Sequence, residues 1–283
     1  MGIFSPLIAA LLQAGSYTLD KAALNVRRID WKTYTSVSFP LLMIFDALFL
    51  LIVRPAVTWS TLGGLAGIFV AVSIVTGYIT NALYYRALDD EDLHELQTWG
   101  VFIAIPTLIV TSVLFTDERN LVVLIPALIA TAAVTWAHLG KGNGLAVRPK
   151  TIAFIGWMLV ATPALAGMTK IILQSWNPIM LELVRDTSLA FIFWLTVSKG
   201  ISQVNRKAWS YLLATNLCSS AAWILYYYGF QQLGIVHTML LFSLTPVLTY
   251  VFALLFLREK FLPRRIIAFV IVLGCIAAAQ LLQ

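Results

Sequence analysis

The chain of 283 residues is 60% hydrophobic and only 11% charged, with a mean hydropathy of +0.88. Soluble domains average about 25% charged residues, so this composition excludes a soluble enzyme, a nucleic-acid-binding protein and a disordered chain. The two cysteines, Cys218 and Cys275, both lie in apolar stretches, which excludes a disulfide framework and a cysteine-based metal site. The formal net charge of +6 is explained by basic loops at a membrane surface rather than by nucleic acid.

Ten apolar segments follow one another, each long enough as a helix to cross a hydrocarbon core ~30 Å thick. In chain order they cover residues 4–25, 33–53, 62–85, 93–115, 121–139, 151–173, 178–197, 209–229, 237–257 and 265–282. The segments are uniformly apolar, whereas the strands of a membrane barrel alternate. The first one has no preceding basic residue and exceeds the length of a signal-peptide core. The sequence therefore predicts an all-α integral membrane protein with ten transmembrane helices.

Basic residues in the short loops predict the orientation of the chain. With ten spans, both termini share one side with the loops that lead from even to odd spans. That side carries Arg54 and Arg119. The other side carries Arg27, Arg28, Lys32, Arg86, Lys141, Arg148, Lys150, Lys199, Arg206, Lys207, Arg258, Lys260, Arg264 and Arg265. The bias predicts that both termini lie outside the cytoplasm, in a multi-pass protein of the cell (inner) membrane.

Glycine and proline mark a break at the midpoint of the chain. Gly140-Lys141-Gly142-Asn143-Gly144 is followed by Arg148-Pro149-Lys150, a composition typical of a linker. We assign residues 141–150 to the linker, between halves at 1–140 and 151–283. Each half contains five spans, and because five is odd the halves must have opposite orientations. This is the arrangement of an inverted repeat.

The two halves share the order of three features. In the first half, Tyr84 and Tyr85 precede Pro106, and Glu118 follows beside a basic residue. In the second half, Tyr226-Tyr227-Tyr228 precedes Pro246, and Glu259 follows between two basic residues. The matching order favours an internal repeat over chance.

The pattern in the second half of the chain resembles the signature of EamA-type transporters of the drug/metabolite transporter superfamily. The residues concerned are Thr245 to Tyr250, then Phe256 to Lys260, and Gly274 in the last span. The first half resembles a degraded copy with one residue fewer between its Pro and its Glu. Over the whole chain, the resemblance implies ten helices in two inverted five-helix repeats, around a central cavity that opens to each membrane face in turn. It implies no particular substrate, because the superfamily moves many kinds of metabolite.

Ionisable residues within spans are costly and need an explanation. Asp20 and Lys21 lie in the first span, and Lys170 lies in the sixth, its counterpart in the other half. The lysines could extend to the headgroups, and Asp20 could neutralise Lys21. Alternatively, Lys21 and Lys170 recognise an anionic group of the substrate, with Asp20 neutralising the empty site.

Four further acidic or basic residues lie in the second and seventh spans. Glu182, Arg185 and Asp186 share one helix face, and we expect this self-neutralising group to be mainly structural. Asp46 has no basic neighbour one turn away. It is either a protonatable coupling group or a partner of a neighbouring helix, and we weigh the two equally.

Histidines and aromatic residues complete the candidate site. His94 and His237 begin the fourth and ninth spans, where they could carry protons between the faces or make a helix-end hydrogen bond. Trp99, Trp223 and Tyr227 lie deeper than an interfacial belt, so they either line a cavity or pack between helices. Tyr84 is assigned to the same cavity lining.

The leading hypothesis is a secondary active transporter, an exporter or exchanger, that moves a small polar or aromatic metabolite by alternating access. The expected partners are this small molecule, the lipid bilayer and protons as candidate coupling ions, without nucleic acid, in a monomer or homodimer. No cofactor, metal or enzymatic activity is expected, because the sequence has no phosphate-binding loop or metal motif. The alternative is a flippase-like protein that moves a lipid-linked sugar, and an intramembrane enzyme is the least favoured.

Overall fold

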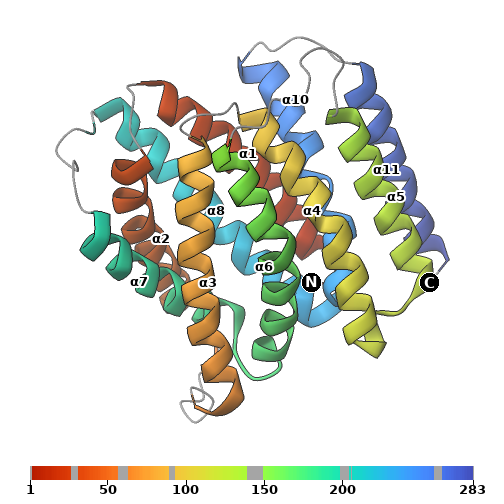
Figure 1. Cartoon of the computed structure of the whole chain (residues 1–283), viewed down its shortest axis with the longest axis horizontal. Coiled ribbons are helices and arrows are strands. Elements are labelled where there is room, and N and C mark those ends of the chain that lie inside the picture. Colours follow the sequence, from red (N-terminus) through yellow and green to blue (C-terminus); the bar gives the residue numbers. More distant parts are fainter. Residues whose placement is uncertain are drawn as a thin grey trace.

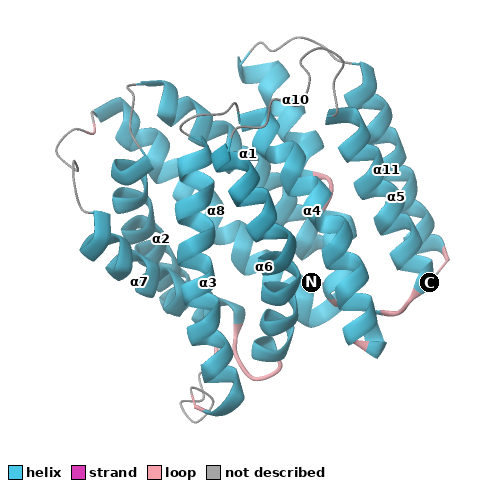
Figure 2. Ribbon diagram, in the orientation of Figure 1, coloured by secondary structure: helices cyan, strands magenta, loops and turns pink. Residues whose placement is uncertain are grey.

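Helices form nearly all of the chain that the computed structural model describes, namely residues 2–26, 31–56, 63–88, 93–138, 149–197, 204, 206–257 and 263–282. Within these ranges no strand is present, as Figure 2 shows. The reason lies in the composition. An apolar chain surrounded by lipid must satisfy its backbone hydrogen bonds within each segment, and a helix does so.

The elements agree with the predicted spans to within a few residues at most ends. They are α1 (Phe4–Val26), α2 (Trp31–Val53), α3 (Gly64–Leu88), α4 (Leu93–Leu114), the 3-10 turn η2 (Thr116–Glu118), α5 (Leu121–His138), α6 (Pro149–Leu173), α7 (Pro178–Val197), α8 (Arg206–Leu233), α9 (Ile235–Phe242), α10 (Thr245–Leu257) and α11 (Pro263–Leu281). Five described segments are by themselves long and apolar enough to cross a membrane: α2, α3 to Ala87, α6 from Thr151, Ile235–Phe252 and α11.

The predicted ninth span is the main difference from the sequence analysis. It is broken at Ser243 and Leu244 into α9 and α10. Pro246 is the second residue of α10, where the missing N–H of proline costs no helical hydrogen bond. Pro106 lies inside the continuous helix α4, so proline alone does not determine the break.

The predicted linker also ends earlier than expected. Residues 141–148 lie outside the described part of the chain. Pro149 and Lys150, which we assigned to the linker, instead begin α6. Proline is favoured in the first turn of a helix because its φ angle is already helical.

The most extensive helix packing joins the first half of the chain to the second. α1 packs against α8, α2 against α7, α3 against α6, and α5 against α11. In Figure 1, α5 and α11 lie side by side at one end of the bundle, whereas α2 and α7 lie at the other. Buried small residues such as Ala10 and Ala14 allow α1 to pack closely.

Large apolar side chains cover the outside of the bundle. Exposed examples on six helices are Leu51, Ile52, Leu65, Val113, Val160, Leu195 and Val270. Soluble monomers rarely expose contiguous apolar surface of this extent. Together with the apolar helices, this surface identifies a multi-pass membrane protein.

Candidate functional site

A cavity of about 520 Å³ lies between the two halves of the chain. Its wall includes residues of α1, α2, α3, α6, α7 and α8, and also Ser243, Thr245 and Pro246 at the break between α9 and α10. Small-molecule sites typically have volumes of about 300–1,000 Å³. The cavity is therefore large enough for a metabolite, and the helix break faces its interior.

One wall of the cavity is aromatic and comes mainly from α8. The ring of Trp223 lies 5.4 Å from that of Tyr226, at a right angle, and 5.9 Å from that of Tyr227. Tyr226 also contacts Phe230 and Phe242, with ring centroids 4.7 and 4.6 Å apart. Rings fixed against one another in this way form a rigid surface on which a flat or cationic group can stack.

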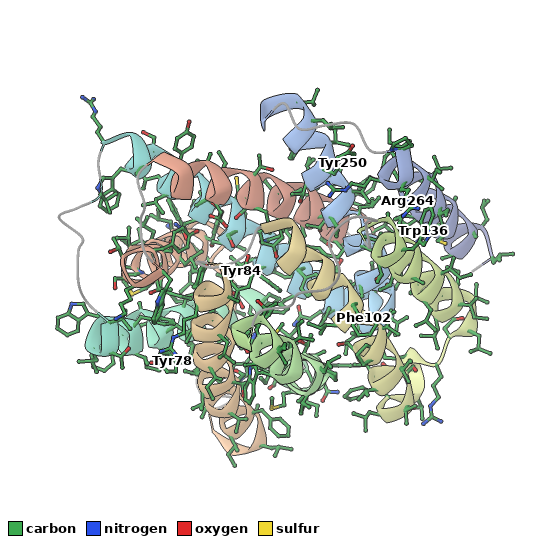
Figure 3. All side chains as sticks on the ribbon, turned by 45° about the horizontal axis from the view of Figure 1, so that its top comes forward. Tyr78, Tyr84, Phe102, Trp136, Tyr250 and Arg264 are labelled. Atoms are coloured by element: carbon green, nitrogen blue, oxygen red, sulfur yellow. The ribbon has the colours of Figure 1, made fainter. Side chains whose placement is uncertain are left out.

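A second aromatic group lies on α3. Tyr84 and Tyr85 line the cavity together with Phe154 of α6. The Tyr84 ring is 5.1 Å from Tyr85 and 5.7 Å from Phe154. Figure 3 shows Tyr84 on the side of α3 that faces the interior of the bundle. The expected lining residues Tyr84, Trp223 and Tyr227 thus share one cavity.

Asp20 lies in the cavity wall, held by hydroxyl groups from two other helices. Its Oδ1 atom accepts hydrogen bonds from the buried Tyr34 hydroxyl on α2 and from the Thr215 hydroxyl on α8, the latter at 2.6 Å. The same Thr215 oxygen lies 3.0 Å from the Ser16 carbonyl oxygen, so its single proton is shared between the two acceptors. These bonds connect α1, α2 and α8 at one point of the wall.

Arg185 has a more central place in the cavity wall than its local sequence pattern predicted. Its guanidinium lines the cavity and donates hydrogen bonds to Ser73 of α3, Thr169 of α6 and Tyr227 of α8, at 3.0, 2.9 and 2.9 Å. It lies 3.7 Å from the Glu182 carboxylate. Because the anchoring hydroxyl groups come from three other helices, α7 presents a fixed cation to the cavity. The spacing of Glu182, Arg185 and Asp186 was the available signal, but it predicted only their common face.

Asp46 lies behind the cavity wall on α2. Its side chain is fully buried, and Oδ1 accepts a hydrogen bond from the Ser220 hydroxyl. The other oxygen, Oδ2, has no hydrogen-bond partner among the described residues. Asp186, which does line the cavity, lies next to Asp46 and interacts with it directly.

Lys170 contacts carboxylates rather than the cavity. Its ammonium group pairs with Asp117 at 2.5 Å and with Glu118, both in η2. Glu118 is 4% exposed and accepts backbone N–H bonds from Ile235 at 2.8 Å and Val236 at 3.0 Å, at the start of α9. A carboxylate is favourable there because the N–H groups of the first helical turn lack partners.

We call Asp117, Glu118, Lys170 and the first turn of α9 the Glu118 cluster. It connects the end of α4 to α6 and α9. The Lys170 ammonium lowers the pKa of Asp117 below its ordinary value. Lys170 is absent from the described cavity wall, and its charge is paired with these carboxylates. Recognition of a substrate anion, one of the two alternatives for this residue, stays a prediction.

Of the remaining expected residues, only His237 has a described side chain, and it lies outside the described cavity wall. Nε2 of His237 lies 2.6 Å from Nε2 of Gln280 on α11, and His237 is absent from the described wall. Lys21 lies on α1, and His94 and Trp99 lie on α4. The side chains of these three residues are outside the described part of the structure.

The comparisons with known proteins agree with this architecture. Residues 152–279 match the model of the EamA-like transporter family. A solved structure titled "Crystal structure of protein" has 16% sequence identity to this chain and a TM-score of 0.75, covering 99% of both chains. At this identity the likeness shows a shared fold alone. No curated protein matches the chain.

The fold and the cavity define the class first: a multi-pass helical membrane protein with an internal cavity. The family match then shows that residues 152–279 are similar to the EamA-like transporter family. The resemblance found in the sequence is thereby confirmed over residues 152–279.

Proposed function

We propose that this protein is a secondary active transporter, an exporter or exchanger, that moves a small polar or aromatic metabolite through the central cavity by alternating access. The observation that carries the proposal is the cavity itself, because its wall is assembled from helices of both halves. A site at the interface of two repeats opens to one face or the other as the halves rock against each other.

The helix packing supports an inverted repeat. Exchanging the halves turns the α1–α8 pair into the α6–α3 pair, and both are among the most extensive contacts. The same exchange maps the α2–α7 pair onto itself and the α5–α11 pair onto itself. The contact of α4 with α6 corresponds to those of α9 and α10 with α1. A two-fold relation between five-helix halves would produce this pattern.

The chemistry of the wall supports the substrate class. Trp223, Tyr226 and Tyr227 provide stacking surface, whereas Asp20 and Arg185 provide one anionic and one cationic group. A metabolite with a ring and a polar or charged group suits this combination. The basic loops support an inner-membrane orientation with both termini outside the cytoplasm.

The test is binding followed by flux. Purified protein is screened by thermal shift against metabolite classes, and a stabilising compound is then measured for uptake into proteoliposomes loaded with the same compound. Trp223→Ala should weaken binding by at least about tenfold, because aromatic residues dominate the energetics of buried contact sites. Trp136→Ala, at an exposed tryptophan on α5, is the matched control and should bind like the wild type.

Two results would contradict the proposal. One is a compound that binds in the cavity but is never taken up under any gradient or exchange condition. The other is translocation of a lipid-linked sugar without flux of any soluble metabolite, which would identify the flippase-like alternative instead.

A further inference from the structure

Three carboxyl groups and one guanidinium form a buried group beside the cavity. We call Asp46, Glu182, Arg185 and Asp186 the Asp46 cluster; no member is more than 8% exposed. With every carboxyl group ionised, two negative charges would remain without a cation from within the cluster. A buried charge without a partner is so costly that the group takes up a proton or another cation.

The Arg185 guanidinium compensates this charge only in part. Its hydrogen bonds go to the hydroxyl groups of Ser73, Thr169 and Tyr227, not to a carboxylate. The nearest carboxylate contact is the 3.7 Å approach to Glu182. Arg185 therefore does not form the bidentate ion pair that would hold the carboxylates in their charged form.

The second observation concerns Asp46. A fully buried carboxylate oxygen is expected to accept a hydrogen bond, yet Oδ2 finds no donor in the described structure. The neighbouring Asp186 carboxyl group supplies a donor only when one of the two carries a proton. The pair thus has a place for one shared proton, with Ser220 holding the other oxygen of Asp46.

Among the residues whose side chains the structure describes, the groups that face the cluster from neighbouring helices do not provide another cation. Ser73 and Tyr85 face it from α3, Thr169 from α6, and Ser220 and Tyr227 from α8. All five are hydroxyl groups. They can relay or stabilise a proton but do not cancel a negative charge at neutral pH.

We propose that the Asp46 cluster is the proton site of this transporter, in which Asp46 and Asp186 share one proton and Glu182 contacts Arg185. Glu182 and Asp186 line the cavity, so the proton moves from cavity water to a carboxylate oxygen and returns to water when the cavity opens to the other face. The role of this proton in coupling rests on the proposed transport function. Binding of the proton to the cluster does not require transport and can be measured by itself.

The experiment measures the proton directly, without substrate or gradient. Wild-type protein in lipid bilayers is examined by pH-difference infrared spectroscopy for the C=O stretch of a buried protonated carboxyl group. We expect the band at neutral pH, with its loss on alkalinisation. Both Asp46→Asn and Asp186→Asn should abolish it. Asp117→Asn, at an ion-paired carboxylate outside the cavity, should leave it unchanged.

A milder variant keeps the test valid if the Asn variants fail to fold. Ser220→Ala removes the hydroxyl hydrogen bond to Asp46 and should shift the band to higher frequency without removing it. The proposal is overturned if the wild type shows no such band, or if the band persists in Asp46→Asn and does not shift in Ser220→Ala. It is also overturned if sodium chloride, compared with choline chloride at the same pH, removes the band, because the site would then take sodium. The proteoliposome uptake assay tests the proposed transport function separately, so its result does not depend on whether the infrared band is observed.

Discussion

At the scale of single residues, Gly234 is required by the Glu118 cluster. Its φ angle of +81° lies in the region that favours glycine, and a Cβ atom there would lie 2.7 Å from Oε1 of Glu118. The carboxylate approaches the α9 N–H groups through this opening. A side chain at position 234 would displace the capping group of α9.

Gly234→Ala should therefore destabilise the protein by about 1–2 kcal/mol from backbone strain alone, with the displaced carboxylate adding to this. Thermal unfolding in detergent, followed by intrinsic fluorescence, measures the loss. Gly274→Ala is the matched control, because a Cβ atom at position 274 meets nothing within 4 Å. Equal melting temperatures of the two variants would refute the role of Gly234.

The pairing of Asp117 with Lys170 predicts a dependence on pH. Because the pKa of Asp117 is lowered in the folded protein, the pair stabilises the fold above the ordinary Asp pKa of about 3.9. This stabilisation disappears as the pH falls through the lower, folded value. Asp117→Asn should thus have a lower melting temperature than the wild type at neutral pH, and the difference should vanish on acidification. A difference independent of pH would show that the charge of Asp117 is irrelevant.

At the scale of elements, the break between α9 and α10 is the feature that shapes the cavity. Ser243, Thr245 and Pro246 reach the wall because the helix stops and restarts there. Membrane transporters commonly place discontinuous helices at their binding sites. The counterpart helix α4 contains Pro106 but is continuous, so the two halves differ in this respect.

Pro246→Ala should allow the helix to continue through the break, because alanine restores an N–H donor and removes the ring that proline places against the preceding turn. Hydrogen–deuterium exchange of a peptide covering residues 240–250 should become slower. Pro106→Ala should leave exchange of this peptide unchanged. Unaltered exchange in Pro246→Ala would mean that packing, not the proline, holds the break open.

The sequence was sufficient to predict the helices, but it did not predict which side chains pair with one another across helices. Uniform apolarity predicted helices that the structure reproduces. Lining of a cavity was one of two alternatives for Trp223 and Tyr227, and the structure places both in the cavity wall together with Tyr84. The partners of Lys170 are 52 and 53 residues away, and Ser220 is 174 residues from Asp46. No local pattern reveals such distant partners. For the same reason Arg185 was assigned to a local charge group, although its hydrogen bonds go to three other helices.

At the scale of the whole molecule, the cavity lies where one half of the chain packs against the other. Figure 1 shows both ends of the chain in the lower half of the view. The Glu118 cluster connects α4, α6 and α9, three helices from the two halves, and its rearrangement would accompany opening on its side. An account in which the halves rock around the cavity requires that the same wall residue face each side of the membrane in turn.

The most direct test of this account is the accessibility of one cavity residue from both sides. A cysteine at Ser219, a described wall residue, is placed in a background in which Cys218 and Cys275 are replaced by serine. A membrane-impermeant thiol reagent is then added to right-side-out and to inverted vesicles. The account predicts modification from both sides, slowed in each case by a transported metabolite. Reaction from one side only, whatever the metabolite or gradient, would contradict alternating access.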